Sequence, residues 1–232
     1  LTVSGTTKTV NLSGAAALTI TDIAGAVMTS LDASAMTGAF IGTLTVADDL
    51  AVKLPATVSS TINFGSGQLN NLDSVTGGTG TADVVTGTVT GLLASTGALT
   101  ISAVESVNLT TSGNNTLNLA GVTGATTVAV TDNVQTITGL DLATSITLGL
   151  VADESATASE IDVTAADSTG SSDTLKVVIE NTLGATTSII DASGIETLAL
   201  TQVDAGNNST LDLTTFEGTS ITLDAKAGVT VT

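Results

Sequence analysis

Apolar and polar residues alternate along most of the chain in short runs. Typical runs are Leu18-Thr19-Ile20, Val107-Asn108-Leu109 and Leu117-Asn118-Leu119, in which every second residue is apolar. An apolar period of two is the signature of a β-strand with one buried face. Small polar pairs such as Ser4-Gly5 and Ser13-Gly14 separate the runs and predict turns. The sequence therefore predicts an all-β chain in which helix is scarce.

The spacing of these runs indicates how the strands are arranged. Between residues 99 and 148 successive runs start about 8 to 11 residues apart, so that two runs make a unit of about 18 to 22 residues. That is the length of one coil in a two-faced parallel β-solenoid. Tandem β-sandwich domains have a similar strand spacing and are the alternative. We favour an elongated parallel β-solenoid of the β-helix or β-roll kind with short irregular insertions, because the runs continue without a linker-like change of composition.

The chain also repeats itself at long range. Four stretches recur in the same order at an offset of about 90 to 93 residues, which indicates an internal repeat. The matched stretches are residues 79–85 with 169–175, 104–110 with 195–201, 114–119 with 208–213, and 127–131 with 220–224. We predict a degenerate module over 1–78, a β-repeat module over 79–168 and a truncated second copy over 169–232. We interpret them as one continuous body and as a piece of a longer chain, because the sequence starts at Leu1 without a signal-peptide pattern.

The charge balance excludes several classes of partner. The chain has 22 acidic residues against four Lys, with no Arg and no His, for a net charge of -18. Binding to nucleic acid is excluded by the sign of this charge. No apolar run approaches the length of about 18 residues that a transmembrane helix requires. The absence of Cys excludes disulfides and thiolate metal sites. Most of the acids therefore need water or bound cations as partners.

The residue types also argue against an enzyme. Without His, Cys, Arg or Tyr the chain cannot form the usual nucleophilic triads. Two carboxylates can hydrolyse a glycoside, and the pairs Asp48-Asp49 and Asp153-Glu154 are the nearest candidates. We interpret both pairs as solvated loop charges. Pairs of Thr such as Thr136/Thr138 would suit ice binding, but Thr is the expected outward residue of a strand in this composition.

A hard cation is the expected ligand. The recurring Gly80/Asp83 and Gly170/Asp173 units place a carboxylate beside a turn, where backbone carbonyls can complete an oxygen shell around Ca²⁺. The alternative is an Asp that only hydrogen-bonds its own turn. For any single Asp we favour that alternative slightly, yet we expect at least one Ca²⁺ in the chain. The candidate ligands are Gly78, Gly80, Asp83, Asp153, Glu154, Asp167, Gly170 and Asp173.

Three runs carry a resemblance to a known family. Val104-Glu105-Ser106-Val107-Asn108-Leu109-Thr110, Asn115-Thr116-Leu117-Asn118-Leu119 and Ser30-Leu31-Asp32-Ala33-Ser34 resemble the β-strand repeats of bacterial surface-layer (S-layer) proteins and of large RTX-type surface proteins. The resemblance implies a secreted, calcium-binding structural protein of the cell surface. Its expected partners are copies of itself in a lattice or fibre, with cell-surface polysaccharide as a further candidate. The alternative is a stalk or ligand-binding module of an RTX-type adhesin.

The chain departs from the RTX calcium repeat at one point. That repeat has the form Gly-Gly-x-Gly-x-Asp and occurs in tandem. Here Gly77-Gly78-Thr79-Gly80-Thr81-Ala82-Asp83 has one residue too many before the Asp, and its second copy lacks the leading Gly pair. A tandem calcium roll is therefore not expected, although isolated sites in the turns are. We also expect contacts to other copies or to flanking domains at the ends of the solenoid, where backbone groups lack strand partners.

Overall fold

The chain winds into successive coils of β-strand. The computed structural model describes residues 2, 5–24, 27–46, 49–80, 82–89, 99–111, 115–131, 134–142, 145–149, 159–165, 171–179, 187–202, 209–225 and 229–232. These residues form strands, turns and bends and contain no helix. Neighbouring strands pair in parallel, as a solenoid requires. The predicted parallel β-solenoid is confirmed. The strands fall into two units, unit 1 (Leu1–Thr110 with Gly121–Thr126) and unit 2 (Thr111–Ala120 with Thr127–Thr232).

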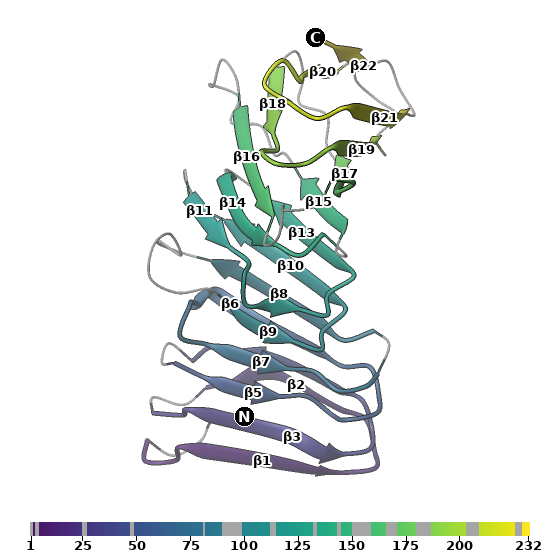
Figure 1. The fold of residues 1–232 in the computed structure, drawn as a ribbon. Coiled ribbons are helices and arrows are strands. Elements are labelled where there is room, and N and C mark those ends of the chain that lie inside the picture. Colours follow the sequence, from purple (N-terminus) through teal and green to yellow (C-terminus); the bar gives the residue numbers. More distant parts are fainter. Residues whose placement is uncertain are drawn as a thin grey trace. The chain divides into compact units, whose positions relative to one another are not determined.

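Unit 1 is built on two sheets, and each coil contributes one strand to each sheet (Figure 1). The first sheet has the order β1 (Thr9–Gly14), β3 (Ser30–Met36), β5 (Ala51–Lys53), β7 (Ser74–Thr76), β9 (Thr100–Ser102) and β12 (Val122–Thr123). In the second sheet β2 (Leu18–Ile23), β4 (Phe40–Leu44), β6 (Thr61–Leu69), β8 (Val84–Val89) and β10 (Ser106–Thr111) follow one another.

Unit 2 repeats this arrangement with two series of strands. One series is β13 (Thr127–Thr131), β15 (Ser145–Gly149), β17 (Thr174–Ile179), β19 (Thr197–Gln202) and β21 (Ser220–Ala225). The other is β11 (Asn115–Asn118), β14 (Val134–Leu140), β16 (Ser159–Ala165), β18 (Thr187–Asp191), β20 (Ser209–Asp212) and β22 (Val229–Val231). The predicted boundaries at 78/79 and 168/169 stay a prediction.

The coil length follows from which residues pair on neighbouring strands. Val128 pairs with Ile146, a step of 146 − 128 = 18 residues. Leu31 pairs with Val52, a step of 52 − 31 = 21 residues. Both steps match the predicted unit. The step from Ile146 to Val177 is longer, at 177 − 146 = 31 residues. A parallel ladder tolerates such a longer step, because residues outside the paired strands need not keep the spacing of the other coils.

The core of unit 1 is made of stacked aliphatic residues. Leu31, Val52, Val75 and Ile101 occupy the same register position on β3, β5, β7 and β9, and all four side chains are buried. Their polar neighbours on the same strands face outward, as the alternation predicts. Each buried aliphatic side chain contributes about 1.5–3 kcal/mol. Regular stacking of medium-sized side chains explains how the chain folds with three aromatic residues.

One corner position of the coils adopts a left-handed backbone. Gly124 and Gly194 have φ angles of 80° and 76°, whereas Ala103 has a φ of 52°. Ala103 occupies the position of Gly194 in the internal repeat, one residue before the matched stretch. A left-handed conformation costs an L-residue about 1–2 kcal/mol, and glycine avoids this cost. Ala103 therefore stores strain that its counterparts do not.

We expect Ala103→Gly to stabilise the protein by about 0.5–1 kcal/mol, because the relief of strain exceeds the extra entropy that glycine has when unfolded. The Ala103 side chain is exposed, so that no buried contact is lost. Urea unfolding measures the change. The control is Ala51→Gly at an exposed position inside β5, where glycine should destabilise by a similar amount. A loss of stability in Ala103→Gly would contradict the prediction.

Candidate functional site

Asp83, the central residue of the predicted calcium turn, is fully buried, with 0 % of its surface exposed. Its Oδ1 accepts a hydrogen bond from the amide of Ser60 at 2.8 Å, and its Oδ2 accepts one from the amide of Gly78 at 3.0 Å. Gly78 belongs to the turn that leads to Asp83, whereas Ser60 belongs to the preceding coil. The carboxylate therefore ties its own turn to the coil before it.

The next coil holds Asp83 in the same way. The amide of Asp83 donates to Oε2 of Glu105 at 2.7 Å, and the amide of Ser106 donates to the carbonyl of Asp83 at 3.0 Å. Both backbone groups of Asp83 are thus paired with the coil that follows. We call this arrangement a carboxylate clamp. The carboxylate of an acid accepts a hydrogen bond from the backbone amide of a residue one coil earlier. The residue that follows the acid donates its own amide to the carbonyl of the same earlier residue.

Four carboxylate clamps are present in the described residues. The clamping acid and the clamped residue are 22 or 23 positions apart in each, which is one coil. The clamps are Asp73 on Leu50, Asp83 on Ser60, Glu105 on Asp83, and Glu196 on Asp173. A buried backbone amide without a partner costs about 1–3 kcal/mol, and a charged acceptor forms a stronger bond than a neutral one. The clamps therefore hold the coils in register at a corner where the sheet ladder starts.

In each unit a threonine one coil further on binds the carbonyl of a clamping glutamate. In unit 1 the amide of Thr126 donates to the carbonyl of Glu105 at 2.9 Å. In unit 2 the amide of Thr219 donates to the carbonyl of Glu196 at 2.8 Å. The column Asp83, Glu105, Thr126 thus corresponds to the column Asp173, Glu196, Thr219, with offsets of 90, 91 and 93 residues. The internal repeat of the sequence therefore includes the residues that link neighbouring coils in both units.

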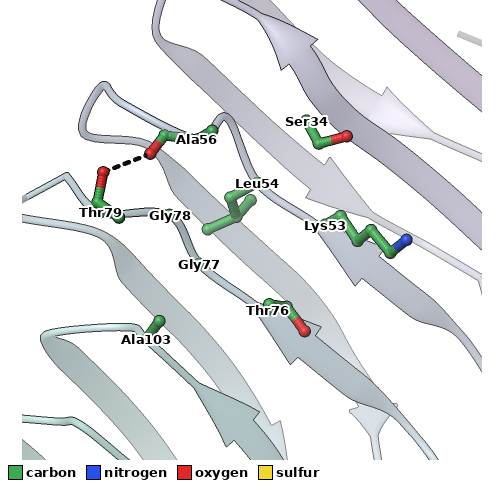
Figure 2. Close-up of a pocket in the computed structure, with 9 residues that line it drawn as sticks. All are labelled: Ser34, Lys53, Leu54, Ala56, Thr76, Gly77, Gly78, Thr79 and Ala103. Atoms are coloured by element: carbon green, nitrogen blue, oxygen red, sulfur yellow. Dashed lines mark hydrogen bonds between the residues drawn. The ribbon is translucent and has the colours of Figure 1, made fainter.

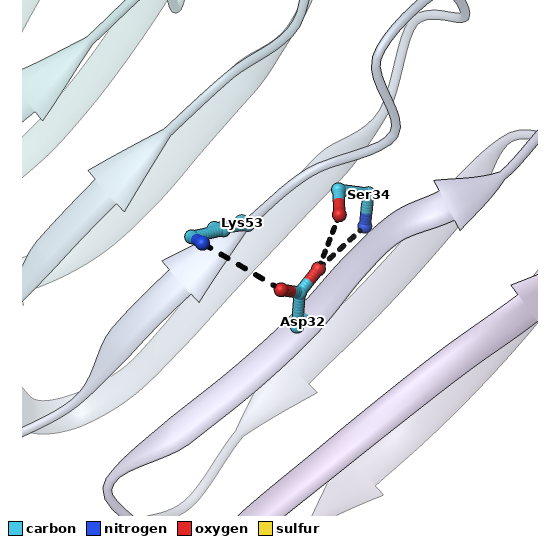
Figure 3. Close-up of polar contacts among 3 residues, drawn as sticks. All are labelled: Asp32, Ser34 and Lys53. Atoms are coloured by element: carbon cyan, nitrogen blue, oxygen red, sulfur yellow. Dashed lines mark hydrogen bonds and ion pairs between the residues drawn. The ribbon is translucent and has the colours of Figure 1, made fainter.

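Among the residues that the structure describes, Asp32 and Asp73 of unit 1 have a shifted pKa. Burial raises the pKa of the Asp73 carboxyl, and the amides of Asn70 and Leu50, each at 2.8 Å from one carboxylate oxygen, oppose this effect. On β3 the hydroxyl of Ser34, followed by its amide, lowers the pKa of Asp32. Lys53 Nζ lies 3.7 Å from Asp32 Oδ2 and adds to the lowering (Figure 3).

The glycine pair of the predicted calcium turn lies between two coils. A Cβ atom on Gly78 would lie 2.3 Å from the carbonyl oxygen of Pro55 in the coil before. A Cβ atom on Gly77 would lie 1.7 Å from the carbonyl oxygen of Ala103 in the coil after. The amide of Gly77 donates to the carbonyl of Ser102 at 2.8 Å. The close approach of three coils accounts for both glycines.

The structure brings only some of the candidate calcium ligands together. Gly78 and Asp83 are hydrogen-bonded, and Gly80 lies in the same turn, close to Val58. Asp173 lies in unit 2, where its backbone is clamped by Glu196. Four candidates lie outside the described residues, namely Asp153, Glu154, Asp167 and Gly170. Within the described ranges no three His, Cys, Asp or Glu side chains gather closely enough to hold a metal ion.

The geometry of Asp83 suits a structural role better than metal binding. Both of its carboxylate oxygens already accept a hydrogen bond from a backbone amide. Because Asp83 is fully buried, no water is at hand to complete the oxygen shell of a bound Ca²⁺. Sequence reasoning placed Asp83 at a key turn but missed the clamp. A signal was present, since each clamping acid directly precedes a strand: Asp73 before β7, Asp83 before β8, Glu105 before β10 and Glu196 before β19.

A groove of about 360 Å³ lies beside this turn, where the coils of unit 1 leave β3, β5 and β7 (Figure 2). Its lining is small and largely apolar and consists of Ser34, Lys53, Leu54, Ala56, Thr76, Gly77, Gly78, Thr79 and Ala103. The hydroxyl of Ser34 donates to Asp32, and that of Thr79 donates to the carbonyl of Ala56 at 3.0 Å. The groove thus offers one cation, on Lys53, and no carboxylate to act with it in acid–base chemistry.

Comparison with known proteins adds no further identification. No protein-family model matches the chain, and no curated protein or solved structure is significantly similar to it. Among the residues that the structure describes, no helix is both long and apolar enough to span a membrane. Any assignment of function therefore depends on the geometry of the solenoid itself.

Proposed function

We propose that the chain is a structural module of a bacterial extracellular surface layer or fibre that assembles with copies of itself. The observation that carries the proposal is the set of four carboxylate clamps. An enzyme places its buried acids where they face a substrate cavity. Here the buried acids face backbone amides of the adjacent coil, so that they serve the shape of the solenoid. The same property would serve the stalk of an RTX-type adhesin, the alternative function.

Imaging of the purified chain tests the proposal. We expect ordered sheets or fibres when the protein is concentrated in the presence of calcium, because a rigid module with many identical copies gains avidity from repeated weak contacts. Negative-stain electron microscopy over a concentration series, with calcium or with a chelator, gives the result. Isolated particles at every concentration would contradict the assembly role and favour the adhesin stalk.

Calcium is part of this proposal. The described acids outnumber the Lys residues that could pair with them, and the resemblance to surface-layer and RTX-type proteins implies Ca²⁺. We expect calcium to raise the melting temperature, since an ion at 100 times its Kd stabilises the folded state by about 2.7 kcal/mol. Thermal melts with calcium and with a chelator measure this shift. Identical melts, together with no heat on calcium titration, would remove calcium from the proposal.

If calcium raises the melting temperature, a single substitution can locate the bound ion. We expect Asp173→Asn to reduce the calcium-dependent shift if the repeated turn of unit 2 binds calcium. Its matched control is Asp49→Asn, an exposed carboxylate of unit 1 that precedes β5. An unchanged shift in Asp173→Asn would place the ion elsewhere in the chain.

A further inference from the structure

Four neighbouring strands in the second sheet of unit 1 carry no charged side chain. The four consecutive strands β4, β6, β8 and β10 contain no Asp, Glu, Lys or Arg, although the chain as a whole has a net charge of -18. The described acids of unit 1 lie on β2, on β3 and in the turns, where Asp73 and Asp83 are buried. We call the outward side of these four strands the neutral face.

The neutral face is regular and partly apolar. Ile41, Thr61 and Val84 form one row across neighbouring strands, and Thr43, Asn63 and Thr86 form the next row. Ile41 is 50 % exposed, so that one large aliphatic side chain lies at the surface of the neutral face. The other members of the two rows are half-buried or exposed. The face therefore presents methyl, hydroxyl and amide groups in straight rows at the spacing of the strands.

We propose that the neutral face is a lateral contact surface for a second copy of this chain, which deepens the assembly function proposed above and rests on it. The argument is electrostatic. Two copies with this net charge repel each other, and the repulsion acts at close range even at physiological salt, where the Debye length is about 8 Å. The neutral face allows two copies to approach without placing carboxylates opposite each other. Methyl and hydroxyl groups then gain packing and hydrogen bonds.

The size of the neutral face sets the strength of the contact. Four strands about 4.8 Å apart, each about five residues long at 3.3 Å per residue, cover roughly 20 Å by 15 Å. Two such faces bury about 600 Å² in total, little more than a third of the roughly 1,600 Å² that a standard stable interface buries. A single contact is therefore weak. It orders the molecules only when many contacts act together, as in a sheet or fibre.

Paired cysteine variants test the surface, because the chain has no Cys of its own. Thr86→Cys places a thiol at the centre of the neutral face, and Thr100→Cys places one on the outward side of β9 in the other sheet. We expect a bis-maleimide reagent to link concentrated Thr86→Cys into dimers several-fold more efficiently than Thr100→Cys. Equal yields from the two variants would overturn the neutral-face proposal, whether or not ordered assemblies form.

A charge variant separates the surface from the assembly function. Thr86→Asp should abolish lateral order in electron micrographs, whereas Thr100→Asp should assemble as the unmodified chain does, with both variants melting at similar temperatures. If Thr86→Asp assembles normally, the neutral face is not the contact although the assembly function stands. If the unmodified chain forms no assembly but Thr86→Cys still cross-links preferentially, the assembly function fails and the contact stands.

Discussion

Asp83→Asn will lower the free energy of unfolding by about 3 kcal/mol, because the substitution places an N–H donor against another N–H donor inside the solenoid. Both carboxylate oxygens of Asp83 accept backbone amides, from Ser60 and Gly78. Asparagine keeps one acceptor, so that one of the two amides loses its partner in a site without solvent. The charge that strengthens both bonds is lost as well. Urea unfolding monitored by circular dichroism measures the change.

The control for Asp83→Asn is the exposed Asp49. Asp49→Asn removes the same charge from the same unit and should change the stability by less than about 0.5 kcal/mol. The measurement also separates a clamp from a calcium ligand. A clamp loses the same stability with calcium and with a chelator, whereas the loss at a ligand shrinks when the chelator removes the ion. A destabilisation of Asp83→Asn that disappears in the chelator would contradict the clamp.

The architecture could be predicted because it depends on patterns between residues that are close together in the sequence. Runs such as Leu18-Thr19-Ile20 and Val107-Asn108-Leu109 alternate with a period of two, and they lie in β2 and β10 as expected. The spacing of the runs gave the coil length, since the parallel pairing of Leu31 with Val52 falls within the predicted unit. Each coil has a similar structure and contacts only the coils beside it, so the fold can be predicted without knowing contacts between distant parts of the sequence.

The role of the acids could not be predicted in the same way. The internal repeat marked Asp83 and Asp173, but whether an Asp before a strand binds calcium or clamps a backbone amide depends on what the preceding coil presents. That partner is 22 or 23 residues away, and its distance changes with every insertion, as the 31-residue step between Ile146 and Val177 shows. Glu105 lies in a matched stretch and directly before a strand, but neither feature tells which backbone amide its carboxylate accepts.

Gly77→Ala will destabilise the protein by at least about 3 kcal/mol, because no side-chain movement can make room for the added methyl group. The Cβ atom would lie 1.7 Å from the carbonyl oxygen of Ala103 and 2.8 Å from Oδ2 of Asp83. The first of these is a backbone atom, so the two coils must separate. That separation stretches the hydrogen bond from the Gly77 amide to Ser102 and disturbs the Asp83 clamp beside it.

Gly5→Ala is the matched control for Gly77→Ala, because a Cβ atom on Gly5 meets no atom within 4 Å. There the loss of chain entropy in the unfolded state leaves the stability unchanged or raises it by up to about 1 kcal/mol. Urea unfolding of both variants provides the comparison. If Gly77→Ala unfolds within 1 kcal/mol of the unmodified chain, the coils are not in contact at this corner. The glycine pair would then have to be explained by the turn that it forms, where a bound cation is the remaining candidate.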